Sequence, residues 1–561
     1  MRATGTESCD ATGADPFDAA GVDAFVRRLR GSYDEVHPGH WHIDWKSIPS
    51  PFRWYTDAPR TDLPPLSRTI ARGGAAAGRA FAAAPALVRI GTLLQAAYGL
   101  TGVRWYPEGI AKSSPEEPTP VHRNPHYQLR RAMPSGGVTY PGECYVVTTG
   151  AEGLPAGIHH YDAVRHALAL LAPGRPPAAL APPAGQLRIV VTQPLWKNYF
   201  KYGDFSYRLG AMDTGAVIGQ FALAARSWGL PCRITFAVDE SGVLERLGLD
   251  PAGEAAPALL DLPVEDPGRD LADREARLTV RPRWLGESAP PGPATGTRRM
   301  HAACVAAGEP GKPIGLAPVA VADLDGRVDA ELPAVPARTP SVADSWSRSA
   351  LGEQLRGSPL PAGVLASWLP EVLAPLDCDV TGADGGMAHG VDGGVAPGAE
   401  EGMAHPRCLL VVRSVPGVPP GAYLTYGDGR RLVRLAGGDF GPVVQRSMFA
   451  NYMNVGQAPL IAVMTGAADA HLGTGGPVRY RTQHLLAGVL AQRLAVCAAG
   501  AGLSAHPVLG FVSGTLDGPL GLASRGLTSL LMVPVGGFRR GLYLENSLRP
   551  LAATAGHGGG E

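Results

Sequence analysis

The segment NYFKYGDFSYR places two proton-transfer groups next to each other, Lys201 and Tyr202. In isolation a tyrosine has a pKa of about 10 and a lysine a pKa of about 10.4, so neither is a base at neutral pH. A neighbouring ammonium group favours the phenolate, and the pair can therefore supply a base closer to the operating pH. We predict Tyr202 as the general base, with Lys201 lowering its pKa or orienting its ring. The reverse assignment and an ordinary surface pair are the alternatives.

The elements that would position this pair occur twice along the chain. CYVV, LRIVVT and the helical segment YRLGAMDTGAVIGQFALAARSWGL are matched later by CLLVV, LIAVMT and YRTQHLLAGVLAQRLAVCAAGAGL. The spacings of 7 and then 14 positions are the same in Arg208, Gly215, Gly229 and in Arg481, Gly488, Gly502. Both helical segments are apolar on nearly all faces. This pattern predicts two buried central helices, each ended by its last glycine.

Strands that bracket a long helix, repeated once, predict an α+β fold with two tandem domains that form an intrachain pseudo-dimer. The boundaries we predict are a lead-in region at 1–66, a first domain at 67–285, a Pro/Gly-rich connection at 286–340 and a second domain at 341–561. The Gly-rich stretch Gly382 to His405 has the composition of a flexible insertion. Its histidines, His389 and His405, lack partners at a fixed spacing, so no metal site is expected.

Composition excludes several classes of protein. The 561 residues carry 50 basic and 50 acidic side chains, and a net charge of zero argues against a nucleic-acid partner. The seven cysteines include no C-x-x-C pair, which is a poor basis for disulfides or zinc. The N-terminus lacks the apolar core of a secretory signal, and the most membrane-like stretch contains Arg493. We therefore expect a cytoplasmic protein with no membrane contact.

Several segments together resemble a known family. RRAMPSGGVTYPGECYVV, GLPAGIHHYD and KYGDFSYRLGAMDTG are similar to the nitroreductase-fold azoline dehydrogenases, the flavin subunits of streptolysin-, microcin- and thiopeptide-type peptide biosynthesis. The lead-in DWKSIPSPFRWYTDAPRTDLP and the segment LLQAAYGLTG extend the resemblance, which covers about Trp45 to Leu544. The PSGG and KYGD…YR motifs are specific only in combination.

The resemblance implies FMN at the interface of the two copies, with one complete site and one degenerate site. The first copy keeps a PSxG turn, but ARGGAAAGRAF stands at its Arg/Ser element and Thr235-Phe236 at its Gly-Phe step. The second copy keeps the Arg/Ser element and the Gly-Phe step, but not the turn. Ser347 replaces one of the family's two arginine positions, so which arginine binds the phosphate stays open. The implied FMN contacts are Pro134, Ser135, Gly136, Gly137, Arg348, Ser349, Gly510, Phe511, Arg539 and Arg540.

The implied reaction is the oxidation of thiazoline or oxazoline rings in a ribosomally made precursor peptide to thiazoles or oxazoles. In this reaction Tyr202 takes the proton and flavin N5 takes the hydride. Lys201 and Tyr202 match the Lys-Tyr pair on which catalysis in the family depends. Cyclodehydratase partner proteins and further homo-oligomerisation are expectations of the same kind. The alternatives are an NAD(P)H-dependent nitro or quinone reductase of this fold, and a flavin-free scaffold that binds a peptide or a partner.

Overall fold

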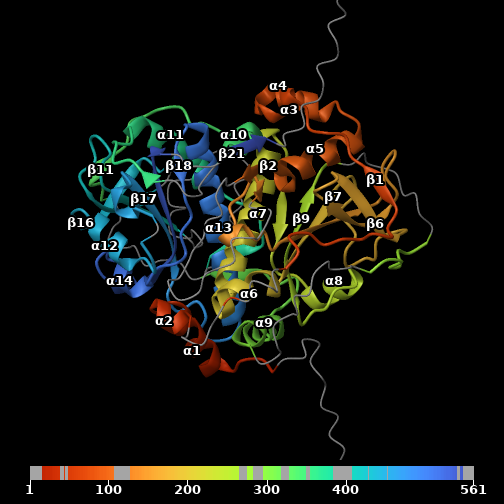
Figure 1. Cartoon of the computed structure of the whole chain (residues 1–561), viewed down its shortest axis with the longest axis horizontal. Helices are drawn as coiled ribbons and strands as arrows, with labels where there is room; N and C mark the ends of the chain where they lie inside the picture. The colour runs from red at the N-terminus through yellow and green to blue at the C-terminus, as the bar shows by residue number, and fades with distance from the viewer. Residues whose placement is uncertain are drawn as a thin grey trace, which may run out of the picture.

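The computed structural model describes residues 15–37, 43, 49–105, 127–264, 274–281, 295–316, 327–348, 354–382, 407–426, 429–451, 453–539 and 544–547. Within them, two halves of mixed helix and sheet lie side by side, the first in orange to yellow-green and the second in cyan to blue (Figure 1). Two long helices, α7 (Ser206–Ser227) and α13 (Gly476–Gly500), pack against each other at the centre. The predicted α+β class with two tandem units is confirmed.

Each half contains a seven-stranded antiparallel sheet, and the two sheets have the same topology. The strand orders are β1-β6-β5-β4-β7-β9-β8 and β11-β16-β15-β14-β17-β19-β18, so the halves correspond strand by strand. The first sheet consists of β1 (Arg60–Asp62), β4 (Glu143–Thr148), β5 (Gly157–Asp162), β6 (Ala167–Pro173), β7 (Leu187–Pro194), β8 (Arg233–Thr235) and β9 (Glu254–Leu262). The second consists of β11 (Ala330–Glu331), β14 (Arg407–Val412), β15 (Gly421–Tyr426), β16 (Arg431–Gly437), β17 (Leu460–Ala467), β18 (Ser504–Ala505) and β19 (Leu527–Gly536).

Both faces of each sheet are buried, because alternate side chains of the central strands enter different cores. In β4, Cys144 and Val146 belong to the core that faces the long helices, whereas Tyr145 and Val147 belong to the core on the opposite face. The core around α7 is completed by Leu485 of α13, and the second half's core takes in side chains from the start of α7. The two halves therefore share their hydrophobic interior.

The remaining helices cover the sheets and the ends of the molecule. They are α1 (Ala19–Leu29), α2 (Tyr33–Val36), α3 (Arg68–Ala71), α4 (Gly74–Ala82), α5 (Ala86–Tyr98), α6 (Trp196–Tyr202), α8 (Glu240–Arg246), α9 (Gly296–Ala306), α10 (Val342–Ser347), α11 (Ala362–Val372), α12 (Gly441–Ser447) and α14 (Ser513–Asp517). Helix α9 lies inside the Pro/Gly-rich connection, so this connection contains regular structure that its composition did not indicate.

The long helices end as the sequence predicts. Gly229 and Gly502 adopt left-handed φ values of 75° and 73°, each directly after the residue that caps the helix. In both copies the next amide donates a hydrogen bond back into the last turn, from Leu230 to Ala225 O at 3.0 Å and from Leu503 to Ala498 O at 2.9 Å. Only glycine adopts this conformation without a steric penalty, which explains its place in both copies.

The crossing of α7 and α13 depends on two further glycines of the repeat. A Cβ atom built on Gly215 would overlap the carbonyl oxygen of Leu485, and one built on Gly488 would overlap that of Met212. The helix backbones are therefore in direct contact at residues that the repeat relates to each other. Beside them, Gln492 Nε2 donates a hydrogen bond of 2.6 Å to Gln220 Oε1 across the interface.

Several short segments tie one half to the other. The C-terminal strand β21 (Leu544–Ser547) pairs with β2 (Leu100–Trp105) of the first half, which also pairs with β3 (Tyr127–Arg131). Parallel pairing joins β10 (Ile314–Leu316) to β13 (Val380–Gly382). Helices α1 and α2 lie beneath the second half in Figure 1, and Arg30 of the loop between them donates to Ala468 O at 2.8 Å. The predicted lead-in region thus contacts the second half.

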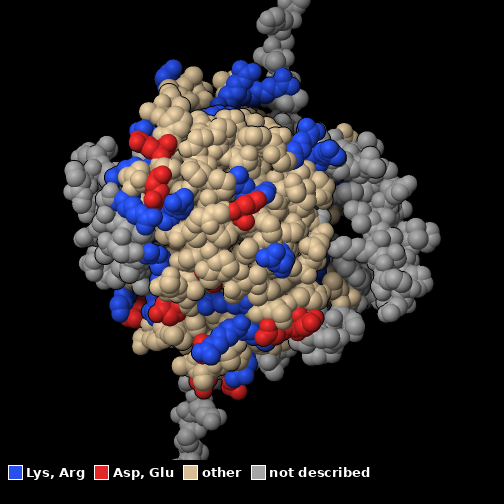
Figure 2. Space-filling model, turned by 90° about the vertical axis from the view of Figure 1, so that its left-hand side faces the viewer, with Lys and Arg blue, Asp and Glu red and all other residues tan. Residues whose placement is uncertain are grey.

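The outer face of the second half, which contains no lysine, carries arginine side chains among aspartates and glutamates on a mostly uncharged surface (Figure 2). In the described part of the chain no helix has the length and apolar character needed to cross a membrane. The six cysteines that the structure describes are all free thiols. Most of the Gly-rich insertion, with His389 and His405, lies outside the described residues.

Substitution of Gly215 by alanine tests the helix crossing. The added methyl group would overlap the Leu485 carbonyl oxygen, and overpacking of this kind costs about 1–3 kcal/mol, or more where backbone must move. We expect a clear drop in the thermal unfolding midpoint, measured by calorimetry. Gly514→Ala in α14 is the control, because nothing lies within 4 Å of its added Cβ. Equal midpoints for the two variants would contradict the close crossing.

Candidate active site

Lys201 and Tyr202 are the last two residues of α6, one turn before the start of α7. Gly203 has a φ of 50°, which ends the helix and starts a 3-10 turn over Gly203–Phe205. Lys201 Nζ lies 5.3 Å from the centroid of the Tyr202 ring, within the range of a cation–π contact. Both side chains are half-buried, so they combine partial desolvation with access to a ligand.

The predicted PSGG turn lies directly against this pair. A Cβ atom on Gly137 would stand 2.5 Å from Tyr202 Oη and 2.7 Å from Lys201 Nζ, and the residue has a left-handed φ of 61°. Both the space and the backbone conformation therefore require glycine. The structure thus brings together two segments that are more than sixty residues apart in the sequence. Pro134, Ser135 and Gly136 form the preceding part of the same turn.

Arg348 comes from the second half and reaches the start of this turn. It follows α10 and is buried, with Nε donating to Ala132 O at 2.8 Å and Nη2 donating to Met133 O at 3.1 Å. The predicted cross-domain meeting of the Arg/Ser element and the PSGG turn is present in the structure. The guanidinium, however, holds the main chain before the turn, a role that its sequence did not indicate. Ser349 lies outside the described residues.

Gly510 is joined through Phe449 to Phe205, in the segment that follows the Lys-Tyr pair. Gly510 O accepts a hydrogen bond of 2.8 Å from Phe449 N, and the Phe449 ring lies 5.9 Å from the ring of Phe205, three residues after Tyr202. Phe511 itself is fully buried in the core on the far face of the second sheet. Only the main chain of this step, not the phenyl ring of Phe511, is therefore available to a ligand.

Arg539 belongs to a strand that pairs with the chain segment following the Arg/Ser element. Strand β20 (Phe538–Arg539) pairs with β12 (Gln354–Leu355), which begins six residues after Arg348. The Arg539 side chain is exposed. Arg540 lies outside the described residues.

Asp213 of α7 is a residue of this site that the sequence prediction missed. Its carboxylate accepts hydrogen bonds from Ser135 Oγ at 2.8 Å, from Gly136 N at 3.0 Å and from Asn198 Nδ2 at 3.4 Å. Burial raises the pKa of Asp213 to about 7, and these hydrogen bonds oppose the rise. The signal that could have found it is a single carboxylate in an apolar helix, GAMDTGAVIG, at a position where the second copy has Leu486.

The other polar residues of the KYGD…YR motif have structural partners. Asp204 accepts a hydrogen bond of 2.7 Å from Thr297 N at the start of α9 and forms an ion pair with Arg28 of α1. Arg208 is fully buried and donates to the carbonyl oxygens of Leu29 and Leu530. The motif therefore divides into a pair that faces the PSGG turn and two residues that fasten α7 to the surrounding chain.

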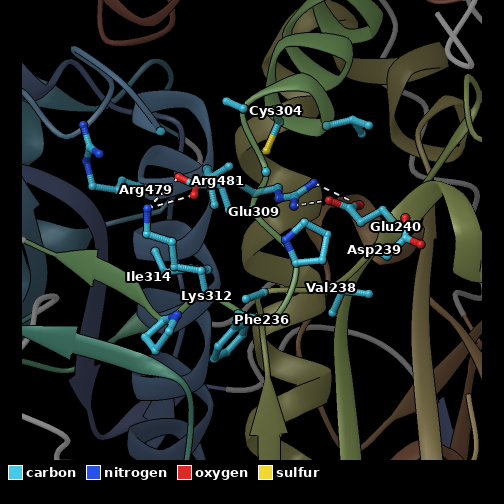
Figure 3. A pocket seen from close by; sticks show the side chains of 18 of the residues that line it. Phe236, Val238, Asp239, Glu240, Cys304, Glu309, Lys312, Ile314, Arg479 and Arg481 are labelled. Carbon is cyan, nitrogen blue, oxygen red and sulfur yellow. Dashed lines mark hydrogen bonds and ion pairs between the residues drawn. The ribbon is translucent and has the colours of Figure 1, made fainter. Parts of the chain in front are cut away.

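The repeat-related position in the second copy is a cavity without the Lys-Tyr pair. Arg208 corresponds to Arg481, an offset of 273 residues, so Thr474 and Gly475 take the places of Lys201 and Tyr202. Both line a cavity of about 360 Å³, together with Phe236 of the first half's Thr235-Phe236 step. Arg481 spans this cavity and pairs with Glu240, while Lys312 at the rim pairs with Glu309 at 2.8 Å (Figure 3). The two ends of the pseudo-dimer thus differ in chemistry.

Comparisons with known proteins fix the fold. A solved structure from Anabaena variabilis, described as a nitroreductase, superposes with a TM-score of 0.66 over 92% of this chain and 99% of its own, at 19% identity. The chain therefore has the nitroreductase fold, as predicted. A chain of the E. coli microcin synthetase McbBCD complex with truncated pro-MccB17 aligns over 42% of this chain and 77% of its own at 20% identity, but its TM-score of 0.24 supports no argument.

A sequence relative is the trifolitoxin-processing protein TfxB of Rhizobium leguminosarum bv. trifolii. The two are 35% identical over 143 residues, which are 23% of this chain and 38% of the relative. The chain thus spans less than two fifths of the length of this relative. No protein-family model matches the chain.

The Asp213 carboxyl should make stability depend on pH. Its folded-state pKa of about 7 exceeds the ordinary 3.8, so the folded chain binds this proton more tightly than the unfolded chain does. The resulting stabilisation is complete below about pH 4 and is lost as the pH rises through about 7. We expect the free energy of unfolding of the unaltered chain, relative to that of Asp213→Asn, to fall between about pH 5 and about pH 8, by at most about 1.4 kcal/mol per pH unit. A calorimetric difference that rises with pH would contradict the raised pKa.

Proposed function

We propose that this nitroreductase-fold protein is an FMN-dependent dehydrogenase that oxidises thiazoline or oxazoline rings of a ribosomally made peptide to thiazoles or oxazoles. The observation that carries the proposal is the contact of the Gly137 backbone with Tyr202 Oη and Lys201 Nζ. A reductase that only passes electrons to an acceptor does not need a phenol and an ammonium beside the ring-binding turn. The relative named for trifolitoxin processing supports a peptide as the substrate.

The residues around the turn fit a flat ring that carries a phosphate. A Cβ at residue 137 would collide with Tyr202 Oη and Lys201 Nζ, so only glycine lets the main chain of the turn lie against the Lys-Tyr pair. From the second half, the Gly510 main chain is the element that we assign to the flavin ring. Because the Arg348 guanidinium already donates to the Ala132 and Met133 carbonyls, the groups we assign to the phosphate are the guanidiniums of Arg539 and Arg540 and the hydroxyl of Ser349. FMN bound there would supply the hydride acceptor.

Aromatisation of an azoline also removes the Cα proton, and this proton needs an acceptor in the protein. Tyr202 Oη is the group we assign, because a phenolate beside the Lys201 ammonium is favoured over one in water. Lys201 contacts the face of the Tyr202 ring and so limits the ring's orientation as well. Half-burial of both groups excludes part of the solvent, which strengthens this electrostatic coupling.

The oxidation acts on a ring that must first be formed by cyclodehydration of a cysteine, serine or threonine. We therefore propose cyclodehydratase proteins as partners of this chain and the precursor peptide as its ligand. The relative's name supports a peptide-processing context, and the chain covers 38% of that protein.

Tyr202→Phe tests the assignment of the base. Loss of a general base typically costs about 10²–10⁴-fold in rate, so azoline oxidation should fall by at least tenfold while FMN remains bound. The measurement is the mass loss of about 2 Da per ring in an azoline peptide, with the flavin spectrum recorded on the same sample. Tyr199→Phe, on the same helix, is the matched control and should oxidise normally. A Tyr202→Phe rate above a tenth of normal would remove the residue from this role.

The asymmetry of the two ends predicts one FMN per chain. Gly137→Ala should lose the flavin, since its Cβ would collide with Tyr202 Oη. Gly315→Ala in the second cavity should retain it, because nothing lies within 4 Å of the added Cβ. Visible absorption of the purified proteins, read as FMN per chain, gives the result. Two FMN per chain would refute the single site, and a colourless chain that cannot be reconstituted would favour the flavin-free scaffold.

A further inference from the structure

The turn that meets the Lys-Tyr pair has an unfavourable backbone conformation. After Gly137, both Val138 and Tyr140 have left-handed φ values, 61° and 44°. Such values are rare for residues with a side chain, and for a β-branched residue they are a marked outlier. A conformation of this kind persists only where surrounding contacts determine it. The contacts that hold this turn are therefore part of the construction of the site.

Asp213 provides the central contact. Ser135 Oγ accepts a hydrogen bond of 2.9 Å from Tyr140 N, so its own proton is directed to the Asp213 carboxylate. Through Ser135 the carboxylate fixes the far end of the turn, and through Gly136 N it fixes the near end. The third donor to Asp213 is Asn198, which also bonds Thr139 of the turn.

The internal repeat supplies an independent comparison. At an offset of 273 residues, Leu486 stands in the place of Asp213 and His471 in the place of Asn198, in the copy that has the Gly-rich insertion instead of the turn. Leu486 is buried, so an apolar side chain fits this position of the long helix. The carboxylate is thus present where the turn is present, although its burial opposes ionisation.

We propose that Asp213 is a positioning residue that holds the strained Pro134–Tyr140 turn so that the Gly137 backbone stays against Lys201 and Tyr202. Three hydrogen-bond donors converge on the two oxygens of the Asp213 carboxyl group, so both oxygens serve as acceptors. An amide at this position would turn hydrogens toward some of those donors. The effect on turnover rests on the proposed function, whereas the effect on the turn does not.

Hydrogen–deuterium exchange on the full chain without flavin tests the proposal directly. Asp213→Asn and Asp213→Leu should each raise the exchange rate of the amides at residues 136–140 by at least tenfold, with little change elsewhere on α7. Thr214→Val is the matched control, because Thr214 is the next residue on α7, is also buried and bonds Gln193 rather than the turn. Unchanged exchange in the turn of both Asp213 variants would overturn the proposal, as would a rise spread evenly over α7.

Turnover supplies a second readout that separates the two hypotheses. With an azoline peptide, the Asp213 variants should lose kcat by at least tenfold with KM little changed, because the substrate site remains while the turn loosens. Ser135→Ala in the Asp213→Asn background should add little, since the two residues act through one hydrogen bond. Additive losses would contradict a shared role. If the unaltered chain oxidises no azoline, the proposed function fails, and the exchange result still decides the role of Asp213.

Discussion

The direct contact of two helix backbones at Gly215 and Gly488 is the constraint on which the rest of the molecule depends. Because neither residue has a Cβ, α7 and α13 cross closely enough for each to complete the other half's core. The sheets, with identical strand order, are arranged around this crossing. The elements that meet between the halves, Arg348 and the PSGG turn, are brought together by the same crossing.

The two halves share one scaffold, but the repeat-related sites at the two ends of the pseudo-dimer carry different residues. One end has a strained glycine turn, a Lys-Tyr pair and a buried carboxylate that bonds the turn. At the other end Thr474 and Gly475 stand in the corresponding places, and the buried Arg481–Glu240 pair joins α13 to α8. Because a charged pair bonded to itself has little capacity left for a ligand, this end is better suited to hold the halves together.

Buried charged side chains of the first half fix the position of α6. Lys197, one turn before Lys201, donates to Glu143 Oε1 at 2.9 Å and to Pro51 O at 3.0 Å, and Glu143 also bonds His160. The lead-in chain thereby fixes the start of the helix that ends in the Lys-Tyr pair. Since breaking a buried pair leaves an uncompensated charge, this arrangement makes the helix position stiff. This stiffness also fixes the position of Lys201 and Tyr202 at the end of the helix.

The sequence by itself determined the repeat, the α+β class, the two central helices and their terminal glycines, because periodicity and spacing are local properties of the chain. It also indicated the segments of the candidate site, the PSGG turn, the Lys-Tyr pair and Arg348. Only the tertiary structure decided which groups meet: Gly137 with Tyr202, Asp213 with Ser135, and Arg348 with the Ala132 carbonyl. These contacts join residues far apart in the chain and depend on how two helices cross, which residue spacing does not encode. For the same reason the core position of Phe511 and the structural role of Arg348 could be seen only in three dimensions.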